Sequence, residues 1–144
     1  MFTRAQAAPN PVVAKIRALL RDARPLIEAD GRELALAYPD EPPPTGQRFP
    51  DARPALAKMR EHLQALRTAV LAQSGGGPAG ASARELTALT LLETDQSLEK
   101  LAEACAAPDP ASANALREES VVLLKQAKST SIKAGKALAI PWPL

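Results

Sequence analysis

The chain has 144 residues, a formal net charge of only +2 and an aromatic content of 3%. This length fits one domain that buries a real core. So small a net charge argues against specific nucleic-acid binding, because nucleic-acid binders usually carry a clear basic excess. The one cysteine, Cys105, cannot form an internal disulfide and is typical of a reducing compartment inside the cell. No run of about 20 apolar residues is present, so we expect no transmembrane segment.

The apolar residues indicate an all-α fold. They are mainly Ala, Leu, Val and Ile, and no stretch alternates β-branched or aromatic residues with polar ones as a strand would. They recur instead at steps of three and four, which places them on one face of a helix. We predict a single domain over residues 1–144, built as a four-helix bundle with helices near 11–29, 51–73, 82–106 and 110–138.

The N-terminal residues contain no acidic side chain before Asp22. We expect residues 1–9 to form a loose arm. Acid-poor, basic and amphipathic starts are typical of mitochondrial import signals. Residues 1–21 therefore have two interpretations, a signal for the mitochondrial matrix or the basic first helix of a cytoplasmic bundle. Their basic residues are Arg4, Lys15, Arg17 and Arg21.

The first helix should begin after Asn10 and end at Asp30-Gly31, because these residue types favour helix ends. Pro25 removes a backbone donor inside it, so we expect a kink or an early end there. Residues 31–50 form a Pro-rich connection whose three consecutive prolines favour extended geometry. We interpret it as a crossover between opposite ends of the bundle, which would let the first two helices lie parallel, or as a cover for one edge of the core.

The second helix carries a packing seam typical of bundles, in which apolar residues alternate at three and four over two heptads. The seam consists of Leu56, Met59, Leu63, Leu66 and Val70. Ser74 to Gly80 follows as a flexible break. It is not a phosphate-binding loop, because no strand precedes it and no Lys-Ser or Lys-Thr follows it.

The third helix should begin at Ser82, because Ser82 and Glu85 have the spacing of a capping box. Its inward face consists of Leu91, Thr94, Leu98, Leu101 and Cys105. Three further leucines fall largely on the other side of the helix, so one core cannot cover all of them. We therefore predict a partner surface formed by Leu86, Leu89, Leu92 and Trp142.

Trp142 lies in a Pro/Trp tail at residues 139–144, in which prolines exclude a helix. The side chain has two interpretations. It folds back as a plug on the end of the bundle, which keeps an indole ring out of water, or it inserts into a partner.

The fourth helix should open at Asp109-Pro110, a cap residue followed by a proline at the first helical position. The break before it is short, so the third and fourth helices should form an antiparallel hairpin. Its inward face consists of Ala113, Leu116, Ser120, Leu123, Ala127, Thr130, Ala134 and Leu138. A candidate basic face lies opposite, where Val121 and Ile132 are interleaved with Lys125, Lys128, Lys133 and Lys136.

The residues that catalysis needs do not occur in a recognisable set. His62 is the single histidine and borders the seam of the second helix, away from any plausible serine partner. It also lacks the His-x-x-Lys-Gly context of phosphotransfer domains, since Ala65 and Leu66 stand in those places. One His and one Cys cannot supply a zinc site, and the Glu-x-x-His motif of di-iron bundles is missing. We expect a protein that is not an enzyme and holds no metal or cofactor.

Three classes of function fit this reading. The first is a non-catalytic interaction module, a small structural or accessory subunit that binds a protein partner or associates with itself. The second is a peripheral binder of anionic membrane or nucleic-acid surfaces through the basic face. The third is a carrier of a small apolar ligand, for which narrow seams of Ala and Leu leave little room. We favour the first and keep the second as the alternative.

Overall fold

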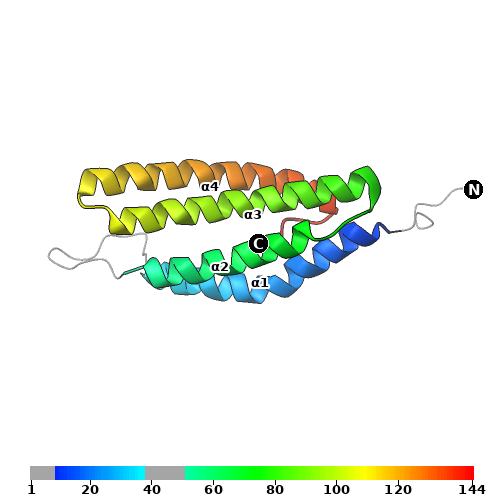
Figure 1. Cartoon of the computed structure of the whole chain (residues 1–144), viewed down its shortest axis with the longest axis horizontal. Coiled ribbons are helices and arrows are strands. Elements are labelled where there is room, and N and C mark those ends of the chain that lie inside the picture. The colour runs from blue at the N-terminus through cyan, green and yellow to red at the C-terminus, as the bar shows by residue number, and fades with distance from the viewer. Residues whose placement is uncertain (1–8, 38–50) are drawn as a thin grey trace, which may run out of the picture.

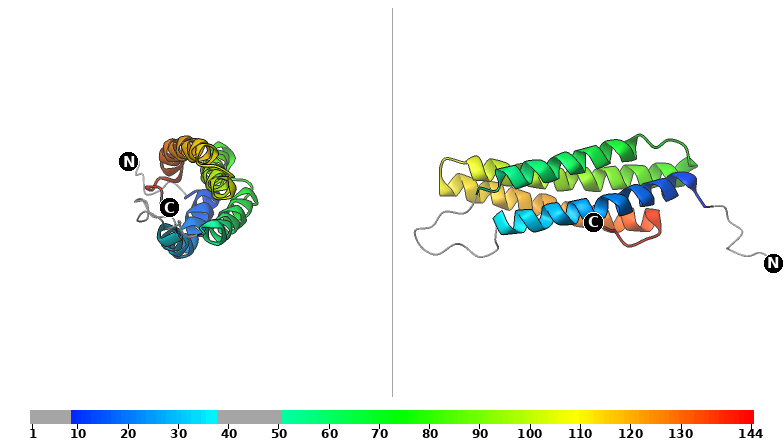
Figure 2. Two further views of the ribbon diagram at one scale, coloured as in Figure 1. Left: turned by 90° about the vertical axis from the view of Figure 1, so that its left-hand side faces the viewer. Right: turned by 90° about the horizontal axis from the view of Figure 1, so that it is seen from below.

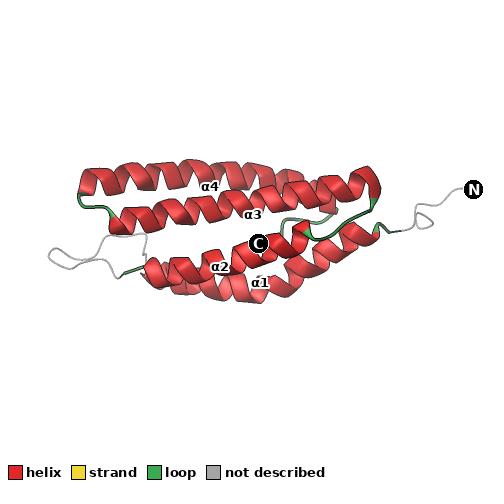
Figure 3. Cartoon of the chain, in the orientation of Figure 1, coloured by secondary structure: helices red, strands yellow, loops and turns green. Residues whose placement is uncertain are grey.

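A computed structural model describes residues 9–37 and 51–144, and the structural statements below concern these residues. They contain four α-helices and no strand (Figure 3). The all-α prediction with four helices is therefore confirmed. The helices are α1 (Pro11–Ala37), α2 (Arg53–Leu71), α3 (Gly77–Ala106) and α4 (Pro110–Leu138).

The helices lie side by side in the order α1, α2, α3, α4 (Figure 1). The most extensive packing joins α3 to α4, then α2 to α3, whereas α4 approaches α1 at few points. In the view along the long axis, the helices form an arc and the chain after α4 lies on the side between α4 and α1 (Figure 2). This arrangement leaves one side of α4 without a neighbouring helix.

The start of α3 corrects the predicted boundary at Ser82. The Asn10 side chain caps α1 by accepting from the N–H groups of Val12 and Val13, and its amide nitrogen donates to the Gly76 carbonyl oxygen at 2.8 Å. Gly76 has φ +78°, and a Cβ there would lie 2.8 Å from the Asn10 Oδ1 atom. Glycine is needed at this position for both reasons. The helix then begins at Gly77 with a proline in its first turn, which suits that residue, and Ser82 lies inside the helix.

The end of α1 is also later than predicted. The helix continues through Pro25 and Gly31 to Ala37, so both the early end and the stop at Asp30-Gly31 are wrong. Asp30 does not end the helix, because its carboxylate is buried and lies 2.5 Å from the His62 Nδ1 atom. Good helix formers follow, and the helix ends before Tyr38-Pro39, where the residue preceding a proline disfavours helical geometry.

The predicted Pro-rich connection at 31–50 is helical in its described part, and residues 38–50 lie outside the described residues, as does most of the predicted arm at 1–9. Glu33 of α1 pairs with Lys58 of α2 at 3.1 Å, and the end of α1 lies at the same end of the molecule as the start of α2 (Figure 1). The predicted crossover between opposite ends is therefore wrong. Helix α2 itself lies within two residues of its predicted bounds.

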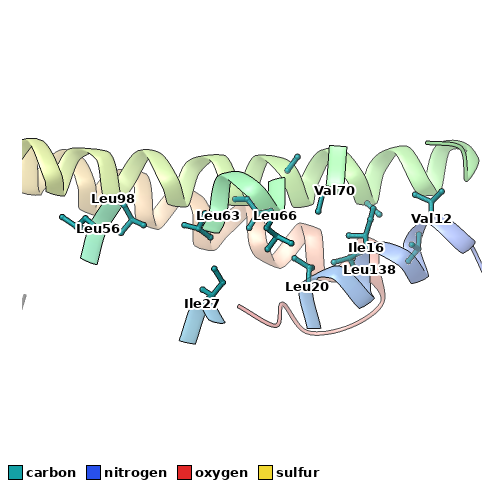
Figure 4. Close-up of a cluster of buried hydrophobic side chains, with 14 of the residues drawn as sticks. Val12, Ile16, Leu20, Ile27, Leu56, Leu63, Leu66, Val70, Leu98 and Leu138 are labelled. Atoms are coloured by element: carbon teal, nitrogen blue, oxygen red, sulfur yellow. The ribbon is translucent and has the colours of Figure 1, made fainter. Parts of the chain in front are cut away.

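The core lies between α1, α2 and α3 and receives Leu138 from α4 (Figure 4). The figure shows side chains of the predicted seam of α2, such as Leu63 and Leu66, turned toward those of α1 and α3. Burial of each such side chain contributes roughly 1.5–3 kcal/mol. The most completely buried large aliphatic side chains are Ile16, Leu20, Leu56, Leu91, Leu138 and Val70.

One buried hydroxyl group weakens this core. Thr87 of α3 is fully buried, and its Oγ1 atom has no hydrogen-bond partner among the described residues. We predict that Thr87→Val raises the free energy of unfolding by about 1 kcal/mol, because valine keeps the shape and removes an unsatisfied polar atom. Urea denaturation followed by circular dichroism measures the change.

Thr90 supplies the matched control. It is equally buried, but its Oγ1 atom donates to the Leu86 carbonyl oxygen at 2.8 Å. Thr90→Val should therefore give no comparable gain. Equal effects of the two substitutions would contradict the assignment of an unsatisfied group at Thr87.

The N-terminal cap of α4 makes stability depend on pH. The Asp109 carboxylate accepts hydrogen bonds from the Ser112 backbone N–H and from the Ser112 hydroxyl group. These bonds, the backbone one most of all, lower the pKa of Asp109 below its ordinary value of 3.8. The carboxylate therefore contributes stability above that value, and the contribution is lost as the pH falls through the lower pKa of the folded state.

We predict that Asp109→Asn, which keeps a capping side chain but cannot titrate, reduces the loss of stability between about pH 5 and about pH 3. Denaturation curves at both pH values measure it. An unchanged loss would show that this cap does not contribute to the acid sensitivity of the protein.

Candidate functional site

A cavity of about 390 Å³ lies where all four helices meet the C-terminal tail. Its walls are mainly aliphatic, and each helix contributes at least one side chain. The sequence did not reveal this space, because it depends on how the tail packs against the helices. The apolar lining residues are Ile27, Met59, Leu63, Leu91, Leu124, Ala127, Trp142 and Leu144.

The polar groups of the lining are largely occupied within α3 and α4. The hydroxyl group of Thr90 donates to the Leu86 carbonyl oxygen, that of Thr94 to the Thr90 carbonyl oxygen, and that of Ser131 to the Lys128 carbonyl oxygen. Lys128 is the charged residue of the lining, and its side chain is exposed. The cavity therefore offers hydrocarbon walls with one cation at its rim.

The tail is fixed to the end of α4 by a Schellman-type turn. The Ala139 N–H donates to the Lys136 carbonyl oxygen at 3.2 Å, and the Ile140 N–H donates to the Gly135 carbonyl oxygen at 3.1 Å. Ala139 has φ +57°, in the left-handed region. Trp142 is half-buried and packs against the core, so it follows the folded-back interpretation.

The outer side of α4 carries the largest exposed apolar residues of that helix. Val121, Val122, Leu124 and Ile132 are between 50% and 59% exposed. By contrast, the fully buried residues of α4 are mostly small: Ser120, Ala127, Ala134, Gly135 and Leu138. An amphipathic helix that packs only inward would have its larger apolar residues buried. Sequence reasoning found Val121 and Ile132 and missed the other two, although Leu124 continues the step of three and four between them.

The four predicted lysines lie on the same outer side of α4 and are all exposed. No acidic residue follows Glu119 in the chain, so the second half of α4 is basic. We define the α4 outer face by its apolar residues and by these lysines, and use that name below. The face consists of Val121, Val122, Leu124, Lys125, Lys128, Ile132, Lys133 and Lys136.

The three leucines of the predicted partner surface are only partly exposed. Leu89 is 44% exposed, whereas Leu86 and Leu92 are half-buried. None of the three lines the cavity that Trp142 borders. Leu92 lines a separate hollow with Arg67 and Asp95, between α2 and α3. Leu89 is therefore the most accessible of the three, and none of them shares the lining of this cavity with Trp142.

The side chains with catalytic potential are engaged in contacts between helices. His62 is half-buried and pairs with the buried Asp30. Arg60 of α2 pairs with Asp95 of α3 at 2.9 Å. Burial raises the pKa of the half-buried Cys105 thiol, which disfavours the reactive thiolate. These contacts orient the helices, and they do not bring a nucleophile and a base together.

Neither a metal cluster nor a membrane span is evident in the part of the chain that the structure describes. No group of three or more His, Cys, Asp or Glu side chains is arranged there to hold a metal ion. None of the described helices combines the length and apolar character needed to cross a bilayer.

Comparisons of the chain with protein-family models, with curated proteins and with solved structures find no match. The surfaces of the molecule are therefore the basis for inferring its function.

The turn at the end of α4 can be tested with two opposite substitutions. A Cβ at Gly135 would lie 2.8 Å from the Ile140 carbonyl oxygen and 3.2 Å from the Trp142 nitrogen, so Gly135→Ala should displace the tail and lower stability. Ala139→Gly should raise it by about 1 kcal/mol, because glycine adopts the left-handed conformation without strain.

Thermal unfolding measures both changes, and the fluorescence of the single tryptophan reports the tail. We expect emission at longer wavelength for Gly135→Ala, because Trp142 becomes more exposed, and unchanged emission for Ala139→Gly. Identical emission in all three proteins would show that Gly135 does not position the tail.

Proposed function

We propose that this protein is a non-catalytic interaction module that acts as a small structural or accessory subunit of a larger protein assembly. In this proposal the helices form one four-helix bundle with an antiparallel α3–α4 hairpin, and the α4 outer face binds a protein partner. The observation that carries it is the distribution of side chains on α4, which buries small residues and exposes Val121, Leu124 and Ile132.

The exposed residues are spaced so that one partner element can cover them together. Val121 and Leu124 are three residues apart, and Ile132 follows two turns later on the same side of the helix. Covering side chains of this size contributes roughly 1.5–3 kcal/mol each when burial is complete. Single exposed apolar residues are ordinary, but a cluster on one helix marks an interaction surface.

The charge of the α4 outer face indicates what kind of partner fits. Four lysines surround the apolar residues, and no acidic residue occurs on the helix after Glu119. A complementary surface would therefore combine apolar side chains with carboxylates, as one face of an amphipathic helix can. A hollow of about 490 Å³ beside the tail, lined in part by Ile132, Lys136 and Trp142, offers space for a side chain of that partner.

The alternative is a peripheral binder of anionic membrane or nucleic-acid surfaces through Lys125, Lys128, Lys133 and Lys136. The acid-free second half of α4 favours it. Helices that lie on membranes usually place Trp, Phe or Leu on their apolar side, however, and Leu124 is the one such residue of the α4 outer face, whose other apolar residues are Val and Ile. We therefore favour a protein partner. The lone cysteine favours a reducing compartment, either the cytoplasm or the mitochondrial matrix.

The test removes the apolar part of the α4 outer face. We predict that Val121→Ser with Ile132→Ser lowers the recovery of specific co-purifying proteins at least about tenfold, because it deletes two anchor side chains. Affinity purification from native cells with quantitative mass spectrometry measures recovery. Circular dichroism should show that the helices remain, since both side chains are exposed.

The matched control is Leu26→Ser with Leu36→Ser, which removes two exposed leucines from α1. It should leave recovery unchanged. Equal recovery with the α4 variant would contradict a protein partner on this face. The membrane alternative predicts salt-sensitive flotation with anionic vesicles. Flotation that persists in the serine variant and is lost after Lys125→Ala with Lys133→Ala would favour this alternative.

A further inference from the structure

We propose that the cavity between the four helices and the tail binds a single-chain amphiphile with one anionic head group, such as a medium-chain carboxylate. The hydrocarbon chain would occupy the cavity, and the head group would lie at the rim beside Lys128. This inference concerns the cavity and does not depend on the protein-docking role of the α4 outer face.

The size and walls of the cavity suit a hydrocarbon chain. Its volume of about 390 Å³ falls at the lower end of the range of roughly 300–1,000 Å³ found for ligand sites. Aliphatic side chains from all four helices surround it, among them Ile27, Leu63, Leu91 and Leu124. Removal of an alkyl chain from water into such a space is favourable by about 25 cal/mol per Å².

The polar groups of the lining restrict the ligand to few hydrogen bonds. The hydroxyl groups of Thr90, Thr94 and Ser131 donate to backbone carbonyl oxygens of their own helices, so their donors are already used. A ligand with several polar groups along its length would lose its bonds to water without replacement. A ligand that is apolar except at one end has no such cost.

Lys128 determines which end group is favoured. It is the charged residue of the lining, and among the described residues no carboxylate lies within ion-pair distance of its ammonium group. Lys100, for comparison, pairs with both Glu103 and Glu119. An anionic head group beside Lys128 would stay at the exposed rim, so the charge pair forms without burying either charge in the core. A cationic head group would meet a like charge there.

The tail supplies the remaining wall and also a signal for binding. Trp142 and Leu144 line the cavity, and Gly135 allows the backbone of the tail to approach α4 closely. Because Trp142 is the single tryptophan, its fluorescence responds to a chain that enters beside it. A bound alkyl chain should exclude water from the indole ring and shift its emission to shorter wavelength.

The experiment titrates the full chain with dodecanoate below its micelle concentration and follows Trp142 emission, with thermal unfolding as a second measurement. We expect a saturable blue shift and a higher melting temperature. Dodecyltrimethylammonium, which has the same chain and the opposite charge, should bind at least about tenfold more weakly. Absence of saturable binding, or equal binding of the two amphiphiles, overturns the proposal.

Matched variants of α4 locate the head group. Lys128→Gln should weaken dodecanoate binding about threefold to fivefold, as expected for an exposed ion pair. Lys128→Arg should retain it, and Lys125→Gln, outside the lining, should leave it unchanged. Equal losses for Lys128→Gln and Lys125→Gln would mean general attraction to a basic helix and would overturn the assignment of Lys128.

A narrowed cavity provides the last control. Thr94→Phe adds an aromatic ring at a half-buried lining position and should weaken dodecanoate binding without unfolding the helices. Undiminished binding in this variant would place the amphiphile elsewhere and overturn the proposal. Val121 and Ile132 lie outside the lining, so the variant Val121→Ser with Ile132→Ser should still bind dodecanoate. Failure of the amphiphile proposal can therefore be told from failure of the proposed protein partner.

Discussion

The contact between α3 and α4 is the constraint on which the rest of the structure depends. The buried residues of α4 are mostly small, such as Ala127 and Ala134, and a buried pair of hydroxyl groups on Ser97 and Ser120 joins α3 to α4. Small side chains let two helices approach closely over a long distance. They also give α4 little apolar volume with which to cover α1 and α2. Most of the larger apolar side chains of α4 consequently remain at least partly exposed, with Leu138 as the buried exception. Among the described residues, the tail lies on the free side of α4 and leaves the cavity beside it.

Polar contacts between helices then determine how the remaining elements align. Asp30 with His62 joins α1 to α2, Arg60 with Asp95 joins α2 to α3, and Glu93 with Thr130 joins α3 to α4. A partly buried pair of this kind adds little net stability, because desolvation offsets most of the attraction. It does disfavour a shifted register, since a slip would leave a buried carboxylate such as Asp30 without its partner.

The sequence predicted those parts of the fold that local chemistry decides. The bounds of α4 are as predicted, because Asp109 and Pro110 act on the helix that they begin. The predicted end of α1 and the predicted start of α3 were wrong for a different reason. Asp30 is engaged by a residue 32 positions away, and Gly76 by Asn10, 66 positions away. A local reading cannot detect that a capping residue has a distant partner.

The same distinction explains what was found and missed at the candidate surfaces. The lysines and two of the apolar residues of the α4 outer face follow from helical periodicity, so the sequence revealed them. The cavity depends on a left-handed alanine at 139, which no propensity would suggest, and on the close approach that Gly135 allows. Leu124 and Lys128 belong both to the α4 outer face and to the cavity lining. A ligand at the rim would therefore neutralise part of the charge that α4 presents to a partner, and linkage requires that the partner change the affinity for the ligand by the same factor.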